Sequence, residues 1–155
     1  MRGDGDGWVF DGAGGRYWGR HGAAGLLLFA PDAEGTVVVL LQHRAIWSHQ
    51  GGTWGLPGGA RDSHETVEQA AVREANEEAG IIEADLTVVE SIVTHTASGG
   101  WTYTTVLAEA EKPVVTVGNG ESAELRWVPA DEVANLPLHP GLAASWADLL
   151  PKLLV

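Results

Sequence analysis

Residues 59–81, GARDSHETVEQAAVREANEEAGI, form the most informative stretch of this 155-residue chain. The second part of the stretch is rich in good helix formers and ends at Gly80, a residue type that commonly follows the last turn of a helix. Asp62 and Glu65 have the spacing of a capping box, in which each side chain caps the other residue's backbone. The stretch therefore predicts a helix over residues 63–79 that starts at this pair.

Three glutamates lie close together near the predicted end of this helix. Glu74, Glu77 and Glu78 are three and four positions apart, so their side chains share one helix face. Like charges at this spacing repel by about 0.2–0.5 kcal/mol, and the C-terminal dipole of a helix also disfavours anions. Carboxylate clusters of this kind suit a hard cation such as Mg²⁺ or Mn²⁺. A solvated acidic face is the alternative interpretation, and the residues around the helix decide between the two.

A glycine-rich segment precedes the helix. Residues 54–59 read WGLPGG, and glycines let a backbone approach a ligand closely because no side chain intervenes. The amides that follow lead into a helix N-terminus, which favours anionic ligands such as phosphate. The segment is not a P-loop, because no Lys-Ser or Lys-Thr pair follows the glycines. Glycines next to a carboxylate cluster favour a ligand site over a solvated helix face.

Apolar runs on both sides of this region have the pattern of paired strands. Residues 24–30 and 36–41 are separated by turn residues and predict one hairpin. Residues 86–95 and 101–107 predict a second hairpin, with Ala97-Ser98-Gly99-Gly100 between the two runs. Strands on both sides of a long helix favour a mixed sheet.

The remaining segments complete the predicted organisation. A further strand is expected at 124–128, then a short helix after Pro129 and another helix over about 141–150. We predict one α/β domain over residues 21–155, with helices packed on a mixed β-sheet. Residues 1–20, rich in glycine and aspartate, are expected to form a flexible N-terminal segment.

Charge and composition exclude several kinds of partner. With 9 basic and 21 acidic side chains the formal charge is −12, which disfavours nucleic-acid polymers and anionic membrane surfaces. A phosphate-bearing ligand would therefore need a cation to neutralise it. The chain has no cysteine, which excludes disulfides, thiolate metal sites and a thiol nucleophile. No apolar run approaches the ~18 residues of a transmembrane helix, and we expect a cytoplasmic protein.

The stretch 59–81 resembles the Nudix box at each position that this motif specifies. The matching residues are Gly59, Glu65, Arg73, Glu74, Glu77, Glu78, Gly80 and Ile81, with Ala75 where the family usually has a larger aliphatic residue. The resemblance to MutT-like proteins extends over residues 22–150. It implies an α/β/α sandwich in which the box forms a loop–helix–loop motif. It also implies a hydrolase that acts on a nucleoside diphosphate linked to another group and uses Mg²⁺ or Mn²⁺.

The resemblance also implies roles for individual residues around the metal. It implies that Glu74, Glu77 and Glu78 are catalytic and bind the metal. The Gly58 carbonyl and Glu121, a carboxylate in a late loop, are expected as further metal ligands.

Other residues are expected to support the site or to contact substrate. Glu65 and Arg73 are expected to pair and to hold the loop–helix–loop motif in shape. Arginine makes bidentate contacts with phosphate, and an exposed aromatic ring stacks on a base. The residues expected to bind substrate are Arg44, Arg61, Trp47 and Gly59.

The expected function is metal-dependent hydrolysis of a pyrophosphate linkage in a nucleoside diphosphate derivative. The favoured prediction is a nucleoside or deoxynucleoside triphosphate pyrophosphohydrolase. The alternative is a Nudix-like nucleotide-binding or sensor module that catalyses nothing. No box glutamate is lost here, which favours the enzyme. Relatives that cleave ADP-ribose or dinucleoside polyphosphates often carry a proline or tyrosine where this chain has Thr96 and Ala97–Gly99, so both subclasses are disfavoured. The physiological substrate stays open at this point, as does a homodimer.

Overall fold

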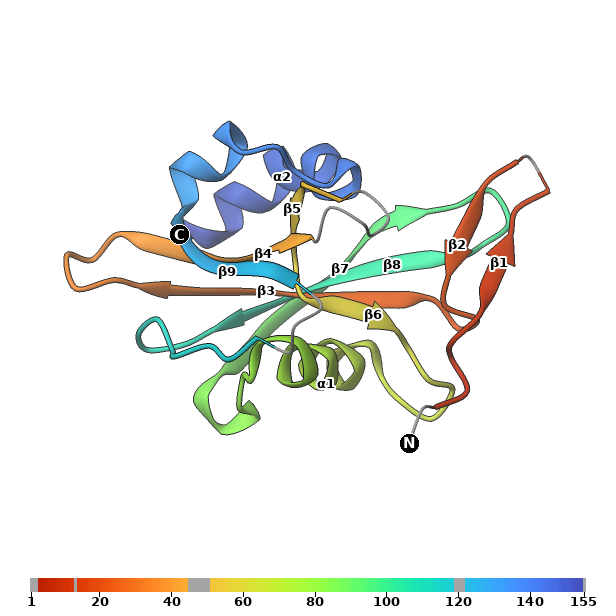
Figure 1. The fold of residues 1–155 in the computed structure, drawn as a ribbon, viewed down its shortest axis with the longest axis horizontal. Coiled ribbons are helices and arrows are strands. Elements are labelled where there is room, and N and C mark those ends of the chain that lie inside the picture. The colour runs from red at the N-terminus through yellow and green to blue at the C-terminus, as the bar shows by residue number, and fades with distance from the viewer. Residues whose placement is uncertain (1–2, 13, 45–50, 119–121, 155) are drawn as a thin grey trace.

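The computed structural model describes residues 3–12, 14–44, 51–118 and 122–154 (Figure 1). Within these residues, a seven-stranded sheet has the main order β5-β4-β3-β8-β7, and β6 and β9 pair with β3 and β4. The strands are β3 (Ala23–Pro31), β4 (Val37–Arg44), β5 (Trp54–Gly55), β6 (Gly58–Ala60), β7 (Thr87–Thr96), β8 (Thr102–Glu109) and β9 (Ser122–Pro129). Strands β3 and β8 run parallel and the other paired strands run antiparallel, so the predicted mixed sheet is confirmed.

Both predicted hairpins are confirmed. In the first, β3 and β4 pair antiparallel with Phe29 opposite Val39. The turn between them is held by Asp32, whose carboxylate accepts hydrogen bonds from the backbone N–H groups of Glu34 and Thr36. In the second, β7 and β8 pair antiparallel, with bulges that shift the register along β7.

Two helices cover opposite faces of the sheet (Figure 1). Helix α1 (Val67–Ala79) packs small side chains, including Ala71 and Ala75, on one face of β3 and β8. Helix α2 (Pro140–Leu153) packs Trp146 and its neighbours on the other face. Strand β3 is buried along nearly all its length because it is covered from both sides. The predicted arrangement of helices packed on a sheet is confirmed.

The start of α1 differs from the prediction, and its end agrees. The capping box is formed by Thr66 and Gln69, so the helix begins at Val67 and not at Ser63. The predicted pair does interact, because Glu65 accepts a hydrogen bond from the Asp62 N–H, but both residues precede the helix. Gly80 follows the last turn with φ 70°, a left-handed conformation that suits glycine.

The C-terminal third follows the predicted order. Strand β9 covers the predicted 124–128 and leads into a short 3₁₀ helix, η2 (Ala130–Asn135). Helix α2 starts at Pro140 and continues through Pro151 to Leu153, three residues beyond the predicted end. A further 3₁₀ turn, η1 (Glu83–Asp85), connects α1 to β7. No helix in the described part of the chain is long and apolar enough to cross a membrane.

The N-terminal segment contains regular structure. Strands β1 (Trp8–Phe10) and β2 (Arg16–Trp18) form a small antiparallel hairpin beside the first residues of β8 (Figure 1). The segment is tied to the domain where the Trp101 indole N–H donates to the Gly19 carbonyl at 3.0 Å. The sequence predicted a flexible segment over residues 1–20 and did not predict this hairpin. The division into residues 1–20 and 21–155 stays a prediction.

Candidate active site

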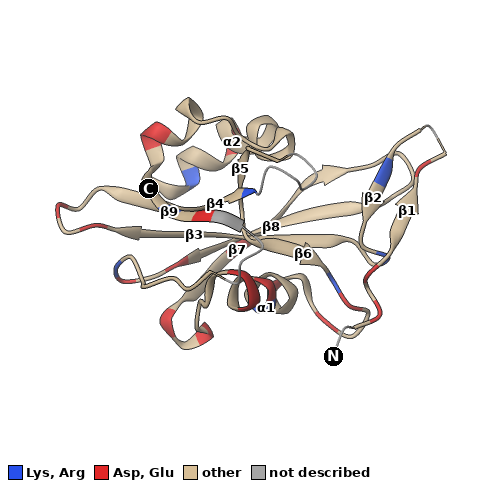
Figure 2. Cartoon of the chain, in the orientation of Figure 1, with Lys and Arg blue, Asp and Glu red and all other residues tan. Residues whose placement is uncertain are grey.

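The three box glutamates lie on the last two turns of α1, where Figure 2 shows acidic residues along the helix. The Glu74 side chain is 16% exposed and the Glu77 side chain is 55% exposed, so they meet different surroundings. Glu78 is half-buried and accepts a hydrogen bond from the Gln42 amide nitrogen at 3.0 Å. The three carboxylates therefore range from the protein interior to solvent.

The electrostatics of Glu78 are unfavourable for a carboxylate that has no cation nearby. Burial raises the pKa of the Glu78 carboxyl well above its ordinary value, and Glu74 adds to this through a hydrogen bond and through its charge. Hydrogen bonds from Gln42 and from the Gly58 backbone act in the opposite direction. The site thus contains two carboxyl groups whose charges oppose one another, one of them poorly solvated.

Two glycines of strand β6 (Gly58–Ala60) are closely packed by their neighbours. A Cβ atom at Gly59 would lie 2.7 Å from the carboxylate carbon of Glu74. A Cβ atom at Gly58 would lie 2.5 Å from the Ala24 carbonyl oxygen on the neighbouring strand β3. Gly59 therefore makes room for a box glutamate, a reason that the sequence did not reveal.

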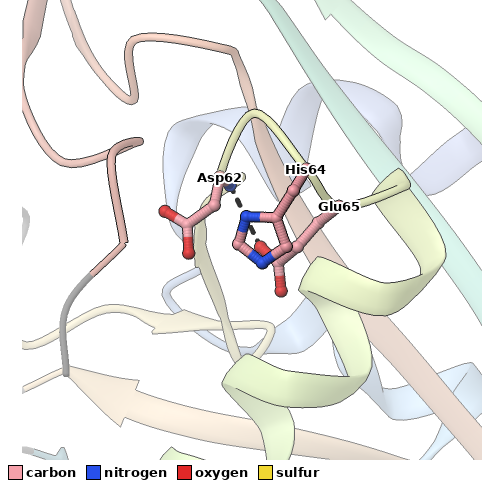
Figure 3. Close-up of side chains that lie close together, drawn as sticks. All are labelled: Asp62, His64 and Glu65. Carbon is pink, nitrogen blue, oxygen red and sulfur yellow. Dashed lines mark hydrogen bonds between the residues drawn. The ribbon is translucent and has the colours of Figure 1, made fainter.

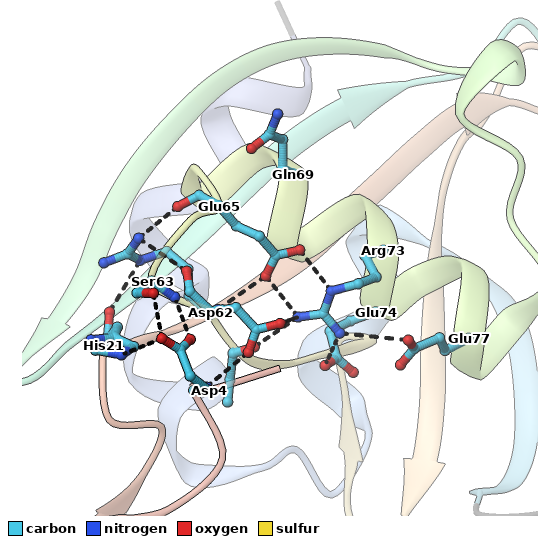
Figure 4. A network of polar contacts seen from close by, with 12 residues as sticks. Asp4, His21, Asp62, Ser63, Glu65, Gln69, Arg73, Glu74 and Glu77 are labelled. Carbon is cyan, nitrogen blue, oxygen red and sulfur yellow. Dashed lines mark hydrogen bonds and ion pairs between the residues drawn. The ribbon is translucent and has the colours of Figure 1, made fainter. Parts of the chain in front are cut away.

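Arg73 connects the loop before α1 to the acidic face of the helix (Figure 4). Its Nε and Nη2 atoms donate to the two carboxylate oxygens of Glu65, at 2.7 and 2.9 Å. Its Nη1 atom donates to Glu74 at 3.0 Å and lies 3.6 Å from Glu77. Hydrogen bonds from Arg73 lower the pKa of the Glu65 carboxyl below its ordinary value. The predicted Glu65–Arg73 pair is present, and the same guanidinium also orients Glu74.

A second acidic group lies in the loop before α1 (Figure 3). Asp62, His64 and Glu65 offer ligand atoms within 4.8 Å of one another, and this is the one such group of three among the described residues. Both oxygens of Glu65 already accept hydrogen bonds from Arg73, and Asp62 lies 3.8 Å from the same guanidinium. Because an arginine already supplies the positive charge here, this group suits a metal ion poorly.

The box glutamates do not form a group as tight as the one in the loop. The ligand atoms of the three carboxylates do not all lie within 4.8 Å of one another, and Glu77 lies 3.6 Å from Arg73. Glu74 lies close enough to Glu78 to raise the pKa of the Glu78 carboxyl, after the larger effect of burial. The structure therefore places the three predicted metal ligands on one helix face, with Glu77 turned toward Arg73.

The predicted substrate residues have different surroundings. Arg61 donates from Nε to the His21 carbonyl and from Nη1 to the Glu65 carbonyl, at 3.1 and 2.6 Å. These donors hold the loop, so the geometry gives the phosphate role of Arg61 no support. Arg44, at the end of β4, is close enough to lower the pKa of the Tyr103 hydroxyl, which burial and then Glu78 raise. Arg44 and Glu78 thus both affect the pKa of Tyr103, which places Arg44 near Glu78. The predicted Trp47 and Glu121 lie outside the described residues.

Sequence reasoning missed Gln42. This side chain lies on β4 in an otherwise apolar run, is 8% exposed and contacts Glu78. The available signal was a lone amide at the end of TVVVLL, a strand that is expected to be buried. Reading it as a site residue requires knowing that β4 lies beneath the end of α1, a contact between distant parts of the chain.

Comparison with known proteins agrees with this geometry. Residues 19–150 match the NUDIX domain. The chain belongs to the Nudix family. This Nudix domain is 65% identical over 153 residues to a Mycobacterium tuberculosis protein named "Putative 8-oxo-dGTP diphosphatase 3", covering 96% of this chain and 70% of that protein. It is 44% identical to a "Nucleoside triphosphate pyrophosphatase/Nudix hydrolase fusion protein" of Bifidobacterium longum, covering 96% of this chain and 32% of the fusion.

A solved structure extends the similarity to the whole fold. The Nudix hydrolase RenU of Mycobacterium smegmatis superposes with a TM-score of 0.92 at 64% identity, covering 96% of this chain and 94% of that one. The predicted Nudix fold is therefore confirmed. This Nudix domain is a pyrophosphohydrolase that acts on nucleotides, and the alternative of a non-catalytic module is disfavoured.

Proposed function

We propose that this Nudix hydrolase cleaves a deoxynucleoside triphosphate to the monophosphate and pyrophosphate, using Mg²⁺ or Mn²⁺ held by its box glutamates. The observation that carries the proposal is the placement of Glu74 beside Gly59 and on the same face of the acidic end of α1 as Glu78. The 65% identical relative is named for 8-oxo-dGTP. That name makes a purine deoxynucleotide with an oxidised base the first substrate to test.

The donor set fits a hard divalent cation. Burial and a like charge disfavour ionised Glu78, and the attraction of a cation beside it would offset both penalties. Glu74, Glu77 and Glu78 would hold the ion, with the Gly58 carbonyl as a further oxygen ligand, and all of these are oxygen donors. Glu121 remains a proposed ligand from outside the described residues. When bound, such a cation neutralises the diphosphate charge and lowers the pKa of a nearby water.

The protein's own residues then perform the proton transfer and the positioning. A carboxylate of the Glu74–Glu78 pair accepts the proton of the attacking water, whose oxygen bonds to phosphorus while the bridging P–O bond breaks. The broken bond is the one between the α- and β-phosphates, and its bridging oxygen leaves with the electron pair as part of pyrophosphate when the α-phosphorus is attacked, or as part of the monophosphate when the β-phosphorus is attacked. Arg73 holds the Glu74 side chain in position by donating a hydrogen bond to its carboxylate. Arg44 is proposed to contact a phosphate of the substrate.

A substrate panel tests the proposal. The wild type is incubated with Mg²⁺ and 8-oxo-dGTP, dGTP, ADP-ribose or a dinucleoside polyphosphate, and ³¹P NMR identifies the products. We expect pyrophosphate from the triphosphates, and a loss of about 10²–10⁴-fold in Glu78→Gln. Glu83→Gln, an exposed change in η1, is the matched control. Nucleotide binding without product from any substrate would overturn the proposal in favour of a sensor module.

Two further proposals concern the protein in the cell. We propose that it acts in the cytoplasm on a small nucleotide carried as a metal complex, because a formal charge of −12 disfavours a nucleic acid or a membrane as its partner. We also retain the homodimer as a proposal. Fractionation and light scattering test them.

A further inference from the structure

Gln42 is a buried polar side chain beneath the acidic end of α1. It belongs to β4, is 8% exposed and pairs across the sheet with Leu125 of β9. Leu40, two residues earlier on the same face, belongs to the apolar cluster under α1. An apolar side chain of the same length would fill this position more favourably, so packing alone does not explain an amide here.

The two ends of this amide have unequal surroundings. Its nitrogen donates to Glu78 Oε1 at 3.0 Å, whereas its oxygen is buried and has no hydrogen-bond partner. Beside a bound cation Glu78 would be ionised and would only accept hydrogen bonds, so the amide turns its N–H toward Glu78. The carbonyl oxygen is left over as a consequence. A buried oxygen without a partner is costly, and such groups in native structures call for an explanation.

We propose that Gln42 is a positioning residue for Glu78 and that its free oxygen accepts a hydrogen bond from a water molecule held beside the box glutamates. The inference rests on the proposed function, because the water and the cation belong to the same reaction. The amide nitrogen fixes one oxygen of Glu78, so the other oxygen faces the cation in a defined orientation. Partners of this kind around metal ligands typically change metal affinity or activity by 10–100-fold.

The test replaces Gln42 by Met, which keeps the length of the side chain and removes both polar atoms. Three quantities are measured: the melting temperature of the metal-free protein, the affinity for Mn²⁺ alone by electron paramagnetic resonance, and kcat and KM with 8-oxo-dGTP. Gln42→Asn, which keeps an amide too short to reach Glu78, is the second variant. Leu125→Met changes a neighbour on the opposite strand and is the control.

We expect Gln42→Met to melt at the wild-type temperature or above it, because it removes the unpartnered oxygen. We also expect Mn²⁺ affinity and kcat to fall by about 10–100-fold with little change in KM, and Gln42→Asn to follow the same trend. A purely structural role would instead lower the melting temperature and leave Mn²⁺ affinity unchanged. Wild-type Mn²⁺ affinity in both variants would overturn the inference. A wild type that binds Mn²⁺ but hydrolyses no nucleotide would overturn the proposed function. The Mn²⁺ affinities of the variants would then still test whether Gln42 positions Glu78.

Discussion

Arg73 donates hydrogen bonds to both carboxylate oxygens of Glu65, at 2.7 and 2.9 Å, across the junction between the glycine-rich loop and helix α1. The Glu65 side chain is only 8% exposed, so solvent screens this pair weakly. The Arg73 guanidinium also donates to the Ala60 carbonyl and to Glu74. One side chain therefore fixes the end of strand β6, the loop after it and a box glutamate.

Replacing Glu65 by Gln is expected to lower both stability and activity. The amide can accept only one of the two hydrogen bonds from Arg73 and brings no charge, so we expect a loss of about 1–3 kcal/mol in the free energy of unfolding. Urea denaturation measures this loss, and kcat is measured in parallel. Glu83→Gln, exposed in η1, is the control. An unchanged urea midpoint in Glu65→Gln would show that the Glu65–Arg73 pair does not stabilise the fold.

The same pair predicts a pH dependence of stability. Hydrogen bonds from Arg73 lower the pKa of Glu65 in the folded protein below its value in the unfolded chain. Its contribution is therefore complete above the unfolded pKa and is lost as the pH falls through the folded pKa. Urea titrations from neutral to acidic pH should show a steeper loss of stability in the wild type than in Glu65→Gln. Parallel curves for the two proteins would contradict this account.

The sequence predicted the elements of the fold better than their exact limits. The hairpin β3–β4 and the glycine at the end of α1 follow from local chemistry, namely two apolar runs separated by turn residues and a left-handed residue. The predicted start of α1 was wrong because two capping patterns overlap. Thr66 and Gln69 form the box, while Glu65 is engaged by Arg73.

The candidate site could be predicted only where its residues are neighbours in the sequence. The shared face of Glu74 and Glu78 follows from helix geometry alone. The contact of Gln42 with Glu78 joins residues 36 positions apart, and it depends on which strand lies beneath the helix. The packing of Gly59 against Glu74 depends on the same tertiary arrangement. No local pattern in the sequence specifies either contact.

Gly59→Ala should displace the Glu74 carboxylate without unfolding the protein. The new methyl group would lie 2.7 Å from the carboxylate, and Glu74 has a flexible side chain that can move away. We expect Mn²⁺ affinity and kcat to fall by roughly 10–100-fold. Gly118→Ala, where the added atom would lie 3.9 Å from Leu125, is the matched control. Wild-type Mn²⁺ affinity in Gly59→Ala would argue against Glu74 as a ligand.

The stability of the loop before α1, which contains Asp62 and Ser63, is also expected to depend on the N-terminal segment. Asp4 accepts hydrogen bonds from the backbone N–H and the hydroxyl of Ser63, and the Gly5 N–H donates to Asp62 at 2.8 Å (Figure 4). Asp4→Ala should therefore lower the melting temperature and increase amide exchange around Ser63. Asp148→Ala, an exposed change on α2, is the control. Equal exchange in the two variants would show that Asp4 does not hold the loop.

Divalent metal is expected to stabilise this protein through Glu78. In the metal-free protein the raised pKa of Glu78 means that stability falls as the pH rises above the unfolded pKa of a glutamate, because the folded state holds its proton more tightly. A cation that binds only the folded state adds stability by mass action and relieves this penalty. The rise in melting temperature on adding Mn²⁺ should therefore be larger in the wild type than in Glu78→Gln, while the metal-free variant should be at least as stable as the wild type. Equal shifts in both proteins would place the metal away from Glu78.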